Sequence, residues 1–227
     1  MDFDTNRIFS LLLSIPAFIA ALTVHEFAHA WTADRLGDDT PRRMGRLTLD
    51  PLAHLDPFGS FAFLISSLSG FGIGWAKPVP FNPRNLDHPR RDAMLIAVAG
   101  PVSNLLQVPI WLFFLWLFHL VAGNVFPSFS GAPDSLMQAG MTMLALAVII
   151  NMLLAAFNMV PLPPLDGHYI LEGLGPPFVA EFFDIIRPYS FLFLILLMWQ
   201  TDWIERAIEP FLAIAVRGVL LALGAPQ

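Results

Sequence analysis

The sequence has no cysteine among its 227 residues, and only 13% of its residues are charged. Without thiols the chain cannot form disulfides or bind a metal through thiolate, so any zinc must be held by nitrogen and oxygen ligands. Hydrophobic residues make up 56% of the chain, whereas soluble domains contain about 45–50% apolar and about 25% charged residues. This composition excludes an ordinary soluble domain and predicts an integral membrane protein.

Several stretches contain no charged residue and are long enough to enter or cross a bilayer. They cover residues 8–24, 58–76, 93–125, 135–165 and, more briefly, 188–201. The first helix is expected from about residue 8 to residue 36, with Gly37 ending it. Asn104, inside one of these stretches, is interpreted as a helix-packing or hydrogen-bonding residue rather than a catalytic one. A last segment, 204–223, is interrupted by charges and fits either a final span or an interfacial helix.

The positive charges are concentrated in one part of the chain. Eight of the twelve Lys and Arg residues lie between Arg35 and Arg91, on the two flanks of stretch 58–76. By the positive-inside rule both flanks are cytoplasmic, so we expect this stretch to re-enter the membrane rather than cross it. A short true span is the alternative, because about 19 residues are enough to cross.

The first uncharged stretch leads directly into the motif His25-Glu26-Phe27-Ala28-His29. On a helix, two His four residues apart lie on one face, which is the spacing for two ligands of one zinc ion. Glu26 then lies next to the open position of the metal, where a general base is needed. At 1.5 Å per residue, His25 lies roughly 15 Å below the cytoplasmic end of the helix. Ionisable groups at that depth are costly to bury, so they indicate a functional site.

A catalytic zinc needs a third protein ligand, for which Asp166 is the best candidate. It follows the proline-rich run 161–165, where an unwound backbone can aim a carboxylate inward, and Gly167 permits a close approach. Taken alone, Asp166 would be interpreted as a turn or helix-cap residue. Three further histidines are weaker ligand candidates. His119 lies near the predicted outer end of its helix, on the wrong side for the site. His54 and His168 fit a supporting role beside the site.

Several longer motifs accompany the His-Glu motif, and the matching region covers about residues 23–170. The motifs are Gly45-Arg46-Leu47-Thr48-Leu49-Asp50-Pro51-Leu52-Ala53-His54-Leu55-Asp56-Pro57, Gly74-Trp75-Ala76-Lys77-Pro78-Val79-Pro80, Ala99-Gly100-Pro101-Val102-Ser103-Asn104 and Asn158-Met159-Val160-Pro161-Leu162-Pro163-Pro164-Leu165-Asp166-Gly167. In these motifs the chain resembles the site-2 protease family of intramembrane zinc metalloproteases. It is similar in particular to the compact prokaryotic branch without peptide-binding or regulatory domains.

The resemblance implies that His25, His29 and Asp166 bind one Zn²⁺ and that Glu26 is the general base. It also implies that Asn158 lies beside the zinc and helps to hold the substrate carbonyl. The implied fold is a three-helix catalytic core that opens towards the cytoplasm. The chain departs from larger family members because it has no helix before the His-Glu helix and no regulatory domain, so substrate selection and regulation stay open.

Together these observations predict an all-α integral membrane protein with a three-helix catalytic core, a re-entrant or β-like membrane-embedded segment, and about four to six membrane segments. We expect one metalloprotease domain over residues 1–227. Its catalytic core covers about residues 8–170, and its C-terminal membrane segments cover about residues 182–224.

The expected function is hydrolysis of peptide bonds within or near transmembrane segments, by a multi-pass protein of the cell membrane. Its partners would be the lipid bilayer and a single-span membrane protein substrate, with no nucleic acid. Glu26 would take a proton from water and pass it to the leaving amine, while Asn158, with help from His54 or His168, would stabilise the oxyanion. An extended substrate would pair with the edge of region 71–83.

Two other functions stay open from the residues alone. A membrane-anchored zincin that cuts non-membrane proteins would take Glu172 or Glu181 as its third ligand. A non-enzymatic metal-binding or transport protein would not need Glu26.

Overall fold

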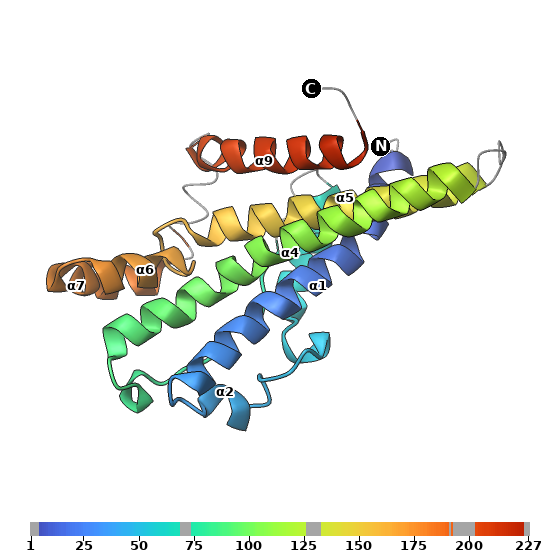
Figure 1. The fold of residues 1–227 in the computed structure, drawn as a ribbon. Coiled ribbons are helices and arrows are strands. Elements are labelled where there is room, and N and C mark those ends of the chain that lie inside the picture. The colour runs from blue at the N-terminus through green and yellow to red at the C-terminus, as the bar shows by residue number, and fades with distance from the viewer. Residues whose placement is uncertain (1–4, 69–73, 126–132, 191, 193–202, 225–227) are drawn as a thin grey trace.

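The computed structural model describes residues 5–68, 74–125, 133–190, 192 and 203–224. Three of the described helices are long and apolar enough to cross a membrane: α1 (Thr5–Arg35), α4 (Pro89–Val125) and α5 (Pro133–Asn158). They lie side by side and form the centre of the molecule (Figure 1). The structure therefore confirms an all-helical chain with helices able to span a bilayer. The first helix ends close to the expected residue, and Gly37 follows it with a positive φ of 103°.

Small side chains occupy many of the buried positions of the three long helices. Ala21 and Ala30 of α1, Ala97 of α4, and Ala147 and Ala155 of α5 are each at most 3% exposed. In lipid, where apolar side chains gain little by leaving the solvent, small residues favour helix association because they let the backbones approach closely. Large side chains of α4 are exposed instead: Phe113, Phe114 and Trp116. This distribution suits a bundle whose outer surface faces lipid.

The remaining helices follow α5 in the chain. They are α6 (Gly167–Leu174), α7 (Pro177–Ile186), η3 (Arg187–Tyr189) and α9 (Trp203–Ala222). α6 and α7 lie at one end of the bundle, and α9 runs along α5 (Figure 1). Ala215 and Val219 of α9 join a buried apolar cluster with Leu115 of α4 and Val148 of α5.

The predicted number of membrane segments is tested only in part. Among the described residues, α9 is not one of the three helices that are long and apolar enough to span, so its role as a last span or an interfacial helix stays a prediction. Stretch 188–201 lies mostly outside the described residues.

Four short elements connect α1 to α4: α2 (Thr40–Arg43), η1 (Pro51–Ala53), α3 (Pro57–Leu68) and η2 (Pro83–Asn85). Phe63 of α3 stacks on Phe18 of α1, with 4.1 Å between the ring centroids and an angle of 9° between the ring planes. Phe63, Phe18 and Leu22 form a buried cluster. This cluster holds α3 against the middle of α1.

The expected re-entrant or β-like segment is not shown: the first part of stretch 58–76 is helical, because α3 continues to Leu68. Periodicity in a short apolar run does not separate a buried strand from a buried helix, which is why the sequence left this open. Residues 69–73 lie outside the described part of the chain. Within the described residues the only β pairing is an isolated antiparallel bridge between Leu55 and Ala76, and re-entry into the membrane is not shown.

The end of α1 is tied to the loop before α4 by one buried carboxylate. Asp38 is 0% exposed and accepts hydrogen bonds from the backbone and hydroxyl of Thr40, the backbone of Asn82 at 2.6 Å and the side chain of Asn85 at 2.7 Å. Burial opposes the charged form of this carboxyl, but the hydrogen bonds outweigh burial and lower the pKa of Asp38. The ionised carboxylate thus holds together two segments that are far apart in the sequence.

Candidate metal centre

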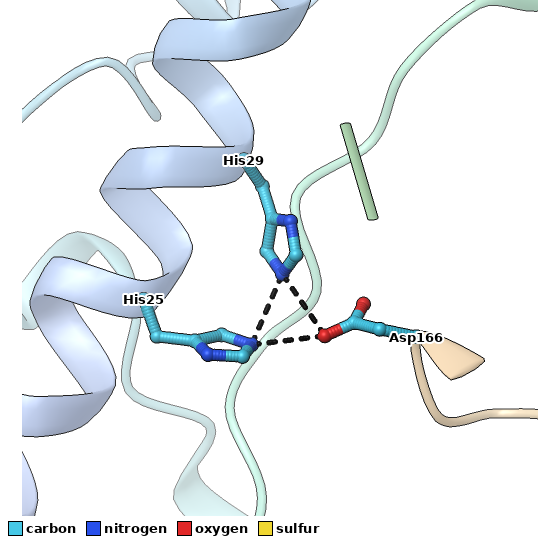
Figure 2. A group of neighbouring side chains, drawn as sticks. All are labelled: His25, His29 and Asp166. Carbon is cyan, nitrogen blue, oxygen red and sulfur yellow. Dashed lines mark hydrogen bonds and ion pairs between the residues drawn. The ribbon is translucent and has the colours of Figure 1, made fainter. Parts of the chain in front are cut away.

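Two imidazoles from α1 and one carboxylate from the start of α6 point at a common position (Figure 2). The Nε2 atoms of His25 and His29 lie 3.0 Å apart. The Asp166 Oδ2 atom lies 3.2 Å from Nε2 of His25 and 3.4 Å from Nε2 of His29. Both imidazoles are buried, with 4% and 7% of each residue exposed. The structure therefore brings together the three side chains that were predicted to bind metal.

The hydrogen bonds of the two Nδ1 atoms determine which nitrogen of each ring carries the proton. Nδ1 of His29 lies 2.7 Å from the carbonyl oxygen of Ile96, and a carbonyl only accepts, so Nδ1 is the donor. Nδ1 of His25 lies 2.6 Å from Oδ1 of Asn104 and donates to it for the same reason. In its neutral form, each ring then presents an unprotonated Nε2 towards Asp166.

With neutral rings, Nε2 of His25, Nε2 of His29 and Oδ2 of Asp166 are three hydrogen-bond acceptors that face one another without a donor. A bound cation would interact favourably with all three. The buried Oδ2 atom of Asp166 has no hydrogen-bond partner. Tetrahedral zinc with ligands at about 2.0–2.2 Å separates neighbouring ligand atoms by about 3.3–3.6 Å, close to the observed 3.0–3.4 Å. Among the described residues, this is the one group of three or more His, Asp and Glu whose ligand atoms lie within 4.8 Å of one another. The donor set and its spacing fit zinc.

Two glycines allow close backbone packing at and beside this group. A Cβ atom on Gly100 of α4 would lie 2.4 Å from Nε2 of His29 and 2.6 Å from Cε1 of His25. A Cβ atom on Gly167 would lie 2.4 Å from the carbonyl oxygens of Met159 and Val160. Gly167 thus packs closely on the backbone that precedes Asp166, and Gly100 places α4 directly against both imidazoles.

The chain was compared with proteins of known description. It is 40% identical to YwhC of Bacillus subtilis (strain 168) over 179 residues, which cover 79% of this chain and 76% of that protein. It is 27% identical to Rip2 of Mycolicibacterium smegmatis (strain ATCC 700084 / mc(2)155) over 187 residues, and 28% identical to Rip2 of Mycobacterium tuberculosis (strain ATCC 25618 / H37Rv) over 188 residues. Each of these two alignments covers 82% of this chain and 66% of the relative. All three relatives carry the name "Putative zinc metalloprotease". The chain belongs to the site-2 protease family of zinc metalloproteases.

No family model matches the chain, and no solved structure matches it. The assignment to the site-2 protease family therefore rests on the sequence relatives, and the His-His-Asp geometry is consistent with their shared name.

In this family member, Asp166 occupies the N-cap position of α6 but makes no capping hydrogen bond with its side chain. The cap interpretation of Asp166 is therefore right for its position and wrong for its carboxylate, which faces the imidazoles instead. The rival third ligands lie elsewhere, because Glu172 pairs with Arg187 at 3.0 Å and Glu181 is exposed.

The helix that follows Asp166 is anchored to α4 and η3. The guanidinium of Arg90 donates to the carbonyl oxygens of Glu172 and Gly175, which belong to the last turn and the C-cap of α6. Burial raises the pKa of Glu172, although its ion pair with Arg187 favours the charged form. Burial lowers the pKa of His168, whose Nδ1 faces the carbonyl oxygen of Leu165. These contacts fix α6, and with it the backbone that carries Asp166.

The structure places the other predicted site residues as follows. Glu26 is 7% exposed and follows the first imidazole on α1. Asn158 ends α5, and its amide donates to the carbonyl oxygen of Leu154 in its own helix at 3.0 Å. His54 is buried and bonds through Nε2 to the carbonyl oxygen of Thr48 at 2.8 Å. The catalytic roles of Glu26 and Asn158 stay predictions.

The sequence analysis missed one polar residue close to the site. Asn151 of α5 is 0% exposed and accepts a hydrogen bond from Asn104 at 2.9 Å. A usable signal was present, since Asn151 is an amide in the middle of an uncharged membrane stretch, where polar side chains are costly. The interhelical partner expected for Asn104 is confirmed.

Proposed function

We propose that this protein is an intramembrane zinc metalloprotease that hydrolyses peptide bonds within or near transmembrane segments of membrane proteins. The observation that carries the proposal is the convergence of His25 Nε2, His29 Nε2 and an Asp166 carboxylate oxygen beside a bundle of apolar helices, with Glu26 next to His25 in the sequence. His25, His29 and Asp166 would hold one Zn²⁺ per chain. Membership of a metalloprotease family supports hydrolysis over mere metal binding.

Zinc, when bound there, supplies a Lewis acid that polarises a peptide carbonyl and lowers the pKa of water towards neutrality. The Glu26 carboxylate accepts a proton from the attacking water and delivers it to the leaving amine nitrogen. The Asn158 amide has two N–H groups, of which one is bonded to Leu154. The second N–H donates to the oxyanion of the scissile carbonyl, a type of contact whose removal costs on the order of a hundredfold in rate.

Residues 58–76 are proposed to re-enter the membrane, and region 71–83 is proposed to receive the substrate. The bridge between Leu55 and Ala76 supports re-entry, because it joins the two ends of this segment at one place. Residues 74–82 contain no helix, and an extended peptide would pair with this part of region 71–83. Residues 71–73 of that region lie outside the described chain.

We propose a location in the cell membrane, with the site opening towards the cytoplasm, from the positive residues that flank this segment. The substrate would be a single-span membrane protein. The packing of α9 on α4 and α5 supports a single domain that includes the C-terminal segments.

The Glu26→Gln variant tests the proposed hydrolysis. The amide keeps the size of the side chain but cannot accept the proton, so zinc is retained while cleavage falls by the roughly hundredfold to ten-thousandfold typical of a lost general base. Membrane proteomes of cells with wild type and with Glu26→Gln are compared, and a single-span protein is expected to accumulate in the variant. The purified enzymes are then assayed on that protein, with zinc content measured in both.

The proposal fails if Glu26→Gln keeps full activity. It also fails as an intramembrane function if no membrane protein changes in abundance and the wild type cuts only soluble peptides.

A further inference from the structure

Three buried polar side chains form one continuous hydrogen-bonded path through α1, α4 and α5. Nδ1 of His25 contacts Oδ1 of Asn104 at 2.6 Å, and Nδ2 of Asn104 contacts Oδ1 of Asn151 at 2.9 Å. Both asparagines are 0% exposed. The path therefore connects the candidate metal centre to the buried interior of the bundle.

The backbone sets the direction of this path. Nδ2 of Asn151 donates to the carbonyl oxygen of Ala147 at 2.8 Å, which leaves Oδ1 of Asn151 as an acceptor. Nδ2 of Asn104 donates to that oxygen and to the carbonyl oxygen of Ala21 at 3.2 Å, which leaves Oδ1 of Asn104 facing His25. Because carbonyl oxygens never donate, both amides have a single consistent orientation.

We propose that Asn104 is a positioning residue for His25, and that Asn151 acts through Asn104. Asn104 holds the imidazole as its Nδ1–H tautomer, so that the Nε2 lone pair faces His29 and Asp166. Without this acceptor the ring is free to rotate or to carry its proton on Nε2, where a proton excludes a cation. The proposal rests on the zinc-dependent function proposed above, since the ring needs this orientation only for a metal.

A purely structural role for the two amides makes a different prediction. An interhelical clamp would affect stability, and its removal would affect metal binding only through unfolding. Replacing Asn104 alone leaves side-chain polar atoms of both His25 and Asn151 unpartnered. Replacing both asparagines by leucine leaves His25 as the one side chain of the path without its partner. Removing both members of a buried pair is often close to neutral for stability. The double variant therefore separates packing from the orientation of His25.

The experiment measures zinc affinity and thermal unfolding of the full-length protein in nanodiscs, with a chelator of known affinity as competitor. The variants are Asn104→Leu, Asn151→Leu and the double variant, with Gln107→Leu as the matched control. Gln107 is buried one turn further along α4 and donates to the carbonyl oxygen of Ser103 in its own helix. Asn104→Leu and the double variant are expected to bind zinc about 10- to 100-fold more weakly. Asn151→Leu is expected to lose less, and Gln107→Leu to match wild type.

A second readout needs neither metal nor activity. In metal-free protein labelled with ¹⁵N-histidine, the His25 signals, assigned by their absence in the His25→Gln variant, are expected to report the Nδ1–H tautomer in wild type. In Asn104→Leu and in the double variant they are expected to report a mixture of tautomers, while Gln107→Leu keeps the wild-type spectrum.

Wild-type zinc affinity in Asn104→Leu overturns the proposal, as does an equal loss in Gln107→Leu. If the double variant is as stable as wild type and binds zinc as tightly as wild type, although Asn104→Leu does not, the two asparagines act only as an interhelical clamp and the proposal is overturned. Failure of the proposed function can be told apart from failure of this proposal. If wild type binds zinc but cleaves no peptide, the proposed function fails, while the expected differences in zinc affinity between wild type and the variants still hold. If wild type binds no zinc, the proposed metal centre is wrong. If, in addition, His25 keeps the Nδ1–H tautomer in Asn104→Leu, then Asn104 does not position His25 and the proposal is overturned.

Discussion

At the scale of single residues, Gly100 determines how closely α4 approaches the two imidazoles. Its Cα faces the metal-binding side of both rings, where any side chain would contact Nε2 of His29. We therefore expect Gly100→Ala to lower zinc affinity roughly tenfold or more, the loss typical when the support of a ligand is disturbed. Alanine favours a helix interior by about 0.5–1 kcal/mol over glycine, so α4 itself is not weakened. Zinc affinity and helical content by circular dichroism are measured together.

Gly218→Ala on α9 is the control for this variant. The added methyl group would lie 3.3 Å from Cδ1 of Leu112, a flexible side chain distant in sequence from the site. It is expected to bind zinc like wild type. Unchanged zinc affinity in Gly100→Ala would contradict this prediction. It would show that α4 moves enough to accommodate the methyl group and that its close approach to His29 is not needed for metal binding.

The three ligand candidates could be predicted because each carries a local signal. His25 and His29 share a helical face by their spacing, and Asp166 follows a proline-rich break. The sequence did not show which groups contact the imidazoles, although Asn104 stood out as a polar residue in an uncharged stretch. The carbonyl of Ile96 and the amide of Asn104 reach the rings only because α4 packs against α1 at one particular height, and helix packing is not readable from a single sequence.

At the scale of elements, long uncharged runs identified α1, α4 and α5 because length and apolar composition decide membrane helices. The connection between α1 and α4 was less predictable. Its short helices are held by contacts between distant residues, such as the stacking of Phe63 on Phe18, and local patterns did not reveal that α3 is helical.

The hydrogen bonds of Asp38 link the end of α1 to η2 and lead to a prediction on pH. The folded-state pKa of Asp38 is lowered, so its unfolded value of about 3.9 is the higher of the two. The contribution of this carboxylate to stability is therefore fully present above the unfolded pKa and is lost as the pH falls through the folded pKa. Near neutral pH, Asp38→Asn is expected to destabilise the fold by about 1–3 kcal/mol, because hydrogen bonds to a charged group become neutral ones.

Thermal unfolding in detergent between pH 3 and pH 7 checks this prediction. The difference between wild type and Asp38→Asn is expected to be constant above about pH 5 and to shrink below about pH 4. Asp87→Asn, at an exposed position in the same region, serves as the control and is expected to follow wild type. A difference for Asp38→Asn that stays constant down to pH 3 would mean that the charge of Asp38 makes no net contribution.

At the scale of the whole molecule, the proposed re-entry and the proposed orientation depend on the same geometry. The bridge from Leu55 to Ala76 brings both flanks of α3 together, and both flanks carry the clustered positive charges. If α4 spans the membrane, the chain just before α4 and the end of α4 lie on opposite sides. The proposed opening of the site at His25 towards the positively charged side depends on this arrangement.

The absence of native cysteine makes this topology directly testable with single-cysteine variants. Met44→Cys lies after α2, Asp87→Cys just before α4, and Asn124→Cys near the end of α4; Met44 and Asp87 are exposed. In intact cells a membrane-impermeant thiol reagent is expected to label only Asn124→Cys, and in inverted vesicles only Met44→Cys and Asp87→Cys. Labelling of Asp87→Cys together with Asn124→Cys would contradict α4 as a span. If instead Met44→Cys and Asp87→Cys label from opposite sides, residues 58–76 cross the membrane, and the substrate cannot reach region 71–83 from the cytoplasmic side as proposed.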